Sequence, residues 1–247
     1  MWCAVNEPTL SVVIPAFNES KRIGGTLREV LDFLKTRPFS WEVLVVDDGS
    51  TDDTAALVEG FAQESAGAIR LVRVPHGGKG WAVRHGMLAA LGQFRFLCDA
   101  DLSMPISEVE RFLPPQCQDY DIAIGSREAP GAKRIGEPAY RHLWGRLFNL
   151  LVRLLAVPGI SDSQCGFKSF RSPVAERLFS VQRLRGFSFD AEVLFLARKM
   201  GLRVVEVPID WYFRQESRVR MLRDGPRMVR DLVLVRWWHL SRQYQDS

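Results

Sequence analysis

The sequence predicts an α/β fold in which helices cover both faces of a mostly parallel sheet. Four short apolar runs alternate with segments of helical periodicity, and polar clusters follow the runs. The runs are continuously apolar rather than alternating, which is typical of parallel strands buried on both faces. Ligands of such sheets bind beyond the carboxyl ends of the strands, and the polar clusters fall there.

The predicted elements follow one another in a regular order through the first half of the chain. Pro15 closes the first strand. Apolar side chains at helical spacing predict a helix over residues 20–35, and Asp52 or Asp53 can cap a second helix. A glycine-rich turn then leads into a third helix over residues 81–91. The four strands are expected over residues 10–14, 41–46, 69–74 and 94–98.

The second half of the chain predicts a loop and two amphipathic helices. Residues 128–140 are rich in Pro and Gly and indicate a mobile loop. Residues 142–156 are apolar apart from one polar stripe, and residues 226–242 carry paired tryptophans beside arginines, with Pro226 in the first turn. Both helices suit a membrane interface, but packing against the core explains them equally well. The polar stripe consists of His142, Arg146, Asn149 and Arg153.

Composition excludes several classes of protein. The 247 residues are 47% hydrophobic and 25% charged, which is ordinary for a globular protein, and a net charge of +4 gives no argument for nucleic-acid binding. Four cysteines without CxxC spacing indicate neither a zinc site nor a disulfide framework, so a reducing compartment fits best. There is no run of about 18 apolar residues and no signal-peptide pattern. We expect a single domain over residues 1–247, located in the cytoplasm, with peripheral attachment to a membrane left open.

The strongest chemical signal is a pair of carboxylates, Asp99 and Asp101, directly after the fourth predicted strand. Side chains two residues apart on a strand point the same way, so the two carboxylates are expected to converge. Two carboxylates at the carboxyl end of a strand provide hard oxygen ligands that suit Mg²⁺ or Mn²⁺. An ion held in this way commonly binds a substrate phosphate as well. Taken alone, the pair fits a solvated turn equally well.

Longer motifs carry a family resemblance. Four of them, in order, resemble the family 2 inverting glycosyltransferases of the GT-A fold. They are S-V-V-I-P-A-F-N-E over residues 11–19, V-V-D-D-G-S-T-D over 45–52, D-A-D over 99–101 and A-I-G-S-R over 123–127. Two more, D-S-Q-C-G-F-K over 162–168 and F-D-A-E over 189–192, resemble the polyprenyl-phosphate hexosyltransferases, in particular the dolichyl-phosphate β-glucosyltransferase branch. The resemblance covers about residues 9–240.

The resemblance implies a GT-A fold, a mostly parallel sheet flanked by helices with amphipathic helices toward the C-terminus, and it implies roles for named residues. Asp99 and Asp101 match the motif for the metal and the sugar diphosphate. Ser103 stands where some relatives have Gln and would be a weaker metal ligand. Arg127 and Arg141 match arginines near the phosphates, where the planar guanidinium binds phosphate bidentately. The positions implied to bind the nucleotide are Pro15, Phe17, Glu19, Asp48, Lys79 and Ala100.

On the acceptor side the resemblance points to Arg214 and Arg218, and to Asp162 and Asp190, which would contact sugar hydroxyls or orient an arginine. Each of these residues also has a structural reading. Asp48 would also suit an ordinary turn, and Lys79 could simply follow a glycine turn. A single arginine often forms only a surface salt bridge. The two remaining aspartates suit buried ion pairs just as well.

The implied reaction is metal-assisted transfer of glucose from UDP-glucose to a polyprenyl phosphate, with inversion, at the cytosolic or inner membrane face. A phosphate monoester has its second pKa near about 6, so the acceptor is already anionic and needs no strong base. The second choice of donor is GDP-mannose. The sequence gives no indication of the oligomeric state.

Three other functions remain open from the sequence. A transferase acting on a soluble acceptor would need a base, for which Asp190 and Glu192 are candidates. A nucleotidyltransferase would usually have a basic, glycine-rich loop after the first strand, where this chain has Ala16-Phe17-Asn18-Glu19. A non-enzymatic nucleotide-sugar sensor is the third.

Overall fold

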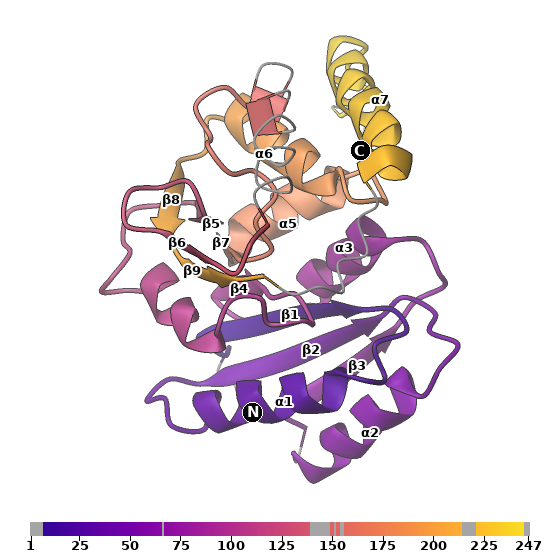
Figure 1. The fold of residues 1–247 in the computed structure, drawn as a ribbon, viewed down its shortest axis with the longest axis vertical. Helices are drawn as coiled ribbons and strands as arrows, with labels where there is room; N and C mark the ends of the chain where they lie inside the picture. The colour runs from indigo at the N-terminus through magenta and orange to yellow at the C-terminus, as the bar shows by residue number, and fades with distance from the viewer. Residues whose placement is uncertain are drawn as a thin grey trace, which may run out of the picture.

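A seven-stranded sheet forms the centre of the computed structural model, which describes residues 7–65, 67–138, 149–150, 152–153, 156–213 and 221–244, the last with backbone only at 221–224 (Figure 1). The strand order is β3-β2-β1-β4-β7-β5-β8. Strand β7 is antiparallel to both of its neighbours and the other pairings are parallel, which confirms the mostly parallel sheet. The strands are β1 (Leu10–Ala16), β2 (Trp41–Asp47), β3 (Ile69–Arg73), β4 (Phe94–Leu97), β5 (Ile122–Ser126), β7 (Lys168–Arg171) and β8 (Val204–Pro208).

Helices cover the two faces of the sheet, as predicted. In Figure 1, α1 and α2 lie below the strands and α3, α5 and α6 above them, with α7 beyond α6. Alternate residues of β1 serve the two cores: Val12 packs with the α1 side, and Val13 packs with the α3 side. The helices are α1 (Ile23–Leu34), α2 (Thr54–Glu64), α3 (Lys79–Ala89), α5 (Ser172–Val181), α6 (Phe189–Lys199) and α7 (Met221–Leu240), with a short 3₁₀ helix at Ile106–Phe112.

Three element boundaries differ from the prediction. Strand β1 continues through Pro15, because the Pro15 nitrogen faces the side on which β4 has already ended. Helix α3 begins at Lys79, so this lysine lies in a first helical turn rather than in a preceding loop. The predicted loop over residues 128–140 is partly wrong, because Lys133–Ile135 forms strand β6 and pairs with β9 (Asp210–Tyr212).

The last helix is longer than predicted and has two different faces. It begins at Met221, so Pro226 lies inside α7 and its expected place in the first turn is wrong. One face is buried against the core through Met228, Leu232 and Val235. Over residues 225–240 of this helix, three large apolar side chains are exposed: Val233 at 56%, Trp237 at 55% and Leu240 at 81%. The helix therefore docks on the core and still presents apolar surface.

The other predicted amphipathic helix, over residues 142–156, lies largely outside the described residues, including His142 and Arg146 of its polar stripe. Among its described residues, Val152 and Ala156 are buried and Asn149, expected on the polar stripe, is buried as well. Within the part of the chain that the structure describes, no helix combines the length and the apolar character needed to cross a bilayer.

Gly86 lets α3 pack closely against the sheet because it has no side chain. Replacing this glycine tests the close packing. A Cβ there would lie 2.4 Å from Val13 Cγ1 and 2.7 Å from Val46 Cγ2. We expect Gly86→Ala to lower the free energy of unfolding in urea by about 1–3 kcal/mol. Gly60→Ala in α2 is the control, because its Cβ meets nothing within 4 Å and should be neutral or stabilising. Equal effects of the two substitutions would contradict the close approach at Gly86.

Candidate active site

Asp99, Asp101 and Lys79 meet at the carboxyl edge of the sheet. The two aspartates follow β4, and Lys79 Nζ lies 2.6 Å from Asp99 Oδ1. Burial alone would lower the pKa of Lys79, but the carboxylates of Asp99 and Asp190, with a smaller contribution from Asp101, raise it above its usual range. The ammonium is therefore held charged beside the aspartate pair.

The turn that carries the two aspartates is tightly built. Asp101 Oδ1 accepts the backbone N–H of Ser103 at 3.0 Å, and the N–H of Leu102 donates to Asp99 O at 3.2 Å. Leu102 has φ of +44°, a left-handed conformation that is uncommon for a residue other than glycine. A Cβ at Gly166 would lie 2.0 Å from Asp99 Oδ2, so residue 166 must be glycine for Asp99 to sit where it does.

The aspartate pair fits a divalent metal of the Mg²⁺ type. No cluster of three or more His, Cys, Asp or Glu side chains among the described residues is arranged to hold an ion. Mg²⁺ commonly binds through one or two carboxylates and completes its shell with water and substrate phosphate, so two aspartates suffice. Asp99 is 26% exposed, and one oxygen of Asp101 accepts the turn N–H, which leaves the other for a ligand. Ser103 is buried at 7% exposure beside them, and its role as a third ligand stays a prediction.

Asp48 organises the loop that precedes α3. Its carboxylate accepts the backbone N–H groups of Gly77 at 2.8 Å and Gly78 at 2.9 Å, and His76 Nδ1 lies 2.9 Å from Asp48 Oδ2. The His76 ring stacks on Phe17, with ring centroids 4.3 Å apart. Asp48 is 3% exposed and its oxygens serve this loop, so the contact with a nucleotide that the resemblance implies would compete with these bonds.

The remaining predicted nucleotide residues lie along the same edge. Pro15 lies near the end of β1, where it pairs with Val46 of β2. Ala100 is buried between the two aspartates, and its carbonyl accepts a hydrogen bond from the hydroxyl of Thr26. The Glu19 carboxylate pairs with Arg22 Nε at 2.6 Å, which holds it close to the chain just after β1. These residues reach the edge from two segments, the end of β1 and the turn after β4.

Arg127 and Asp162 form a bidentate pair directly after β5. Arg127 Nε and one terminal nitrogen lie 2.6 Å and 2.8 Å from the two Asp162 oxygens, and the Arg127 backbone N–H adds a third bond. The guanidinium also lies over the Trp211 ring at 5.4 Å. Burial acts to raise the pKa of Asp162, but the pairing with Arg127 outweighs it and lowers the pKa to about 2. Asp162 thus orients an arginine, one of the roles expected for it.

Replacing Asp162 should change how stability depends on pH. A carboxyl whose pKa falls on folding stabilises the fold above its unfolded pKa and loses this contribution as the pH falls through the folded value, here from about 4 toward 2. The full contribution is about 2 kcal/mol. In Asp162→Asn it is absent, so the difference in unfolding free energy between parent and variant should shrink by about 1 kcal/mol between pH 6 and pH 3. Asp53→Asn, at an exposed position, should show no such change; a constant difference for Asp162→Asn would contradict the pair.

Asp190 lies in the first turn of α6 and is paired inside the protein. Lys168 Nζ lies 2.6 Å from Asp190 Oδ1 and also donates to the carbonyl of Cys165, and both side chains are almost fully buried. Burial raises the pKa of Asp190 although Lys168 and Lys79 oppose the shift. Residues 162–168 therefore connect three parts of the site: Asp162 pairs with Arg127, Gly166 leaves room for the Asp99 carboxylate, and Lys168 pairs with Asp190.

Sequence reasoning missed Lys168, His76 and Gly166. A lysine within the otherwise apolar G-F-K-S-F stretch was the available signal, because a buried lysine needs a buried partner. The predicted residues Arg141, Arg214 and Arg218 lie outside the described residues. Glu192, the second candidate base, has no exposed surface and accepts the N–H groups of Arg183 and Leu184 and the Tyr244 hydroxyl.

Comparison with known proteins decides the family. The family model described as glycosyl transferase family 2 matches residues 11–179, more than half of the chain. The chain belongs to glycosyl transferase family 2. This family 2 chain is therefore a glycosyltransferase, which confirms the expected enzyme class and argues against a non-enzymatic sensor or a nucleotidyltransferase.

Curated relatives match along almost the whole family 2 chain. The dolichyl-phosphate beta-glucosyltransferase of Dictyostelium discoideum is 32% identical over 244 residues, covering 94% of this chain and 75% of the relative. The protein of the same name from Homo sapiens is 33% identical, with coverages of 94% and 76%. The one from Drosophila melanogaster is 35% identical, with coverages of 92% and 74%.

Solved structures confirm the GT-A fold. Mannosyl-3-phosphoglycerate synthase from Rubrobacter xylanophilus superposes with a TM-score of 0.66 at 20% identity, covering 96% of this chain and 75% of that one. Glucosyl-3-phosphoglycerate synthase from Mycobacterium tuberculosis, in complex with Mn²⁺, UDP-glucose and phosphoglyceric acid, gives a TM-score of 0.64 at 20% identity, with coverages of 92% and 78%.

Proposed function

We propose that the chain transfers glucose from UDP-glucose to a dolichyl-type polyprenyl phosphate, with inversion at the anomeric carbon. The observation that carries the proposal is the convergence of Asp99, Asp101 and Lys79 at the carboxyl edge of a family 2 chain. The names of the relatives support glucose as the sugar and dolichyl phosphate as the acceptor. A structural neighbour crystallised with Mn²⁺ and UDP-glucose supports the donor.

The donor end of the site suits a nucleoside diphosphate. Asp99 and Asp101 would hold Mg²⁺ or Mn²⁺, which as a Lewis acid stabilises charge on a leaving diphosphate. The Lys79 ammonium lies beside these carboxylates in the first turn of α3, where backbone N–H groups also favour an anion. The stacked rings of Phe17 and His76 offer an aromatic surface for the base.

The acceptor end favours an anionic nucleophile over a neutral hydroxyl. A sugar hydroxyl would need a free general base, but Asp190 accepts from Lys168 and Glu192 accepts from three donors. A lipid phosphate is already ionised near pH 7 and needs only positioning and charge neutralisation. The occupied carboxylates of Asp190 and Glu192 therefore favour the polyprenyl phosphate over a soluble saccharide acceptor.

A membrane-facing surface would bring the lipid to the site, at the cytosolic or inner face. The exposed residues Val233, Trp237 and Leu240 of α7, with Arg230 and Arg236 among them, suit a bilayer interface. We expect Trp237→Gln with Leu240→Gln to weaken binding to phosphatidylcholine vesicles at least about tenfold, since bound apolar area sets the affinity. Leu57→Gln on α2, which is 39% exposed, is the control. Unchanged flotation of the double variant would remove α7 from the membrane contact.

The donor is tested by nucleotide-sugar choice. Purified protein is given labelled UDP-glucose, UDP-galactose or GDP-mannose with polyprenyl phosphate in detergent, with and without EDTA. The proposal expects label in the lipid from UDP-glucose alone, lost with EDTA and restored by Mg²⁺ or Mn²⁺. Preferred use of GDP-mannose would establish the second candidate donor, and transfer undiminished by EDTA would contradict the metal.

A further inference from the structure

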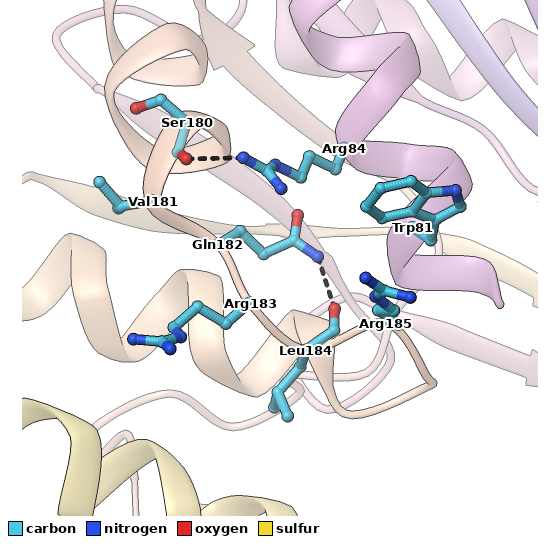
Figure 2. A pocket seen from close by; sticks show the side chains of 8 residues that line it. All are labelled: Trp81, Arg84, Ser180, Val181, Gln182, Arg183, Leu184 and Arg185. Atoms are coloured by element: carbon cyan, nitrogen blue, oxygen red, sulfur yellow. Dashed lines mark hydrogen bonds between the residues drawn. The ribbon is translucent and has the colours of Figure 1, made fainter. Parts of the chain in front are cut away.

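A polar cavity of about 370 Å³ lies between α3, the C-terminal end of α5 and the segment that leads into α6 (Figure 2). It shares no residue with the Asp99 and Asp101 cluster. Its lining is dominated by three arginines, one tryptophan and one glutamine: Arg84, Arg183, Arg185, Trp81 and Gln182. In Figure 2, Trp81, Arg84 and Arg185 lie on one side of Gln182, and the Arg183 side chain extends away from them.

The arginines carry positive charge that no carboxylate among the described residues neutralises through an ion pair. Arg84 donates to the carbonyls of Phe179 and Ser180, both at 2.9 Å, which fixes its guanidinium at the end of α5. The Arg185 guanidinium lies 4.5 Å from the Trp81 ring centroid. The nearby acid, Glu192, is fully buried and accepts backbone N–H groups, with its pKa raised by burial.

Gln182 holds the wall of the cavity together. Gln182 is 2% exposed and its amide nitrogen donates to the carbonyls of Gly80 and Leu184, at 3.0 Å and 2.7 Å. Its Oε1 atom is buried and has no hydrogen-bond partner among the described residues. The positive charge of the three arginines matches a ligand that carries a phosphate.

Arg183 connects the lining of the cavity to α7, the helix that presents exposed apolar side chains. Arg183 lines the cavity and also lies over the Trp238 ring, 4.9 Å from its centroid, and donates to Gln243 O. The neighbouring residue Trp237 is 55% exposed. We infer that this cavity binds the phosphate-bearing headgroup of an anionic membrane lipid, beside the bilayer contact of α7. The inference takes that contact from the proposed function.

Vesicle composition separates the cavity from the α7 contact. Binding to pure phosphatidylcholine vesicles reports α7, and the gain in affinity on adding phosphatidylglycerol, which carries both phosphate and hydroxyls, reports the cavity. We expect Arg183→Gln with Arg185→Gln to reduce this gain about 25-fold, roughly fivefold for each arginine, and to leave phosphatidylcholine binding unchanged. Arg28→Gln with Arg203→Gln removes two exposed positive charges that do not line the cavity, and this control should reduce the gain less than about twofold.

Two controls keep the inference open to contradiction. Arg185→Gln alone removes one positive charge together with the contact to the Trp81 ring, and it should give about a fivefold loss even where Arg183→Gln impairs folding. An undiminished gain in Arg185→Gln and in the double variant would overturn the inference. Release of the parent protein from phosphatidylglycerol vesicles by inorganic phosphate or glycerol 3-phosphate at matched ionic strength would assign the cavity to a free anion instead. Absence of glucosyl transfer by the parent protein, together with a phosphatidylglycerol gain that depends on Arg183 and Arg185, would count against the proposed function and not against the headgroup site.

Discussion

Replacing Asp101 by asparagine is expected to lower kcat/KM for glucosyl transfer by roughly 10²–10³-fold. The substitution keeps the size of the side chain, and the asparagine oxygen can still accept the N–H of Ser103. What it removes is the negative charge that, with Asp99, would hold a divalent cation at the leaving diphosphate. Steady-state kinetics at several concentrations of Mn²⁺ measure the effect.

The matched control is Asp53→Asn, at an exposed position before α2 whose side chain makes no capping hydrogen bond. It should transfer glucose as the parent does. The unfolding free energy of Asp101→Asn should stay within about 0.5 kcal/mol of the parent, as is usual for substitutions away from packed features. Transfer at the parent rate by Asp101→Asn would show that the aspartate pair is a turn and not a metal site.

Lys168→Met is expected to have the largest effect on stability, a loss of about 3–5 kcal/mol in unfolding free energy. It leaves the buried carboxylate of Asp190 and the carbonyl of Cys165 without their partner. A buried charge deprived of its counter-ion costs far more than the pair contributes, because the charge was already removed from water. Urea denaturation followed by tryptophan fluorescence measures the loss.

A double variant separates charge from packing. Lys168→Met with Asp190→Asn removes both charges and should be less destabilised than Lys168→Met alone, a non-additivity typical of contacting residues. Lys35→Met, at the exposed end of α1, is the control and should change stability little. If the loss of unfolding free energy in the double variant equalled the sum of large losses in Lys168→Met and in Asp190→Asn, a direct pair between the two side chains would be contradicted.

The first half of the fold was predictable because its signals are local. Ile23, Leu27, Val30 and Leu34 are buried, as their helical spacing predicts, and β1 to β4 lie where the apolar runs indicate. The aspartate pair was predictable for the same reason, since the spacing of Asp99 and Asp101 at the end of a strand requires no distant information.

The rest of the site depends on segments that meet only in the folded chain. Strand β7 is short and antiparallel, and it starts at Lys168, whose pairing with Asp190 spans 22 residues of sequence. Asp48 has the sequence of a turn residue, and its bonds to Gly77 and Gly78 arise only because β2 and β3 are neighbours. Helix α7 extends to Met221 although Pro226 predicts a start, and the buried residues Leu232 and Val235, which lie after this proline, do not account for the extra turn.

Measuring which acceptor receives the glucose tests the central claim most directly. Labelled UDP-glucose is offered with polyprenyl phosphate, with the neutral polyprenol, and with 3-phosphoglycerate, the acceptor class named in the structural neighbours. The account predicts label in polyprenyl phosphate alone, as a β-linked product that Asp101→Asn does not form. Transfer to 3-phosphoglycerate but not to the lipid phosphate would contradict it.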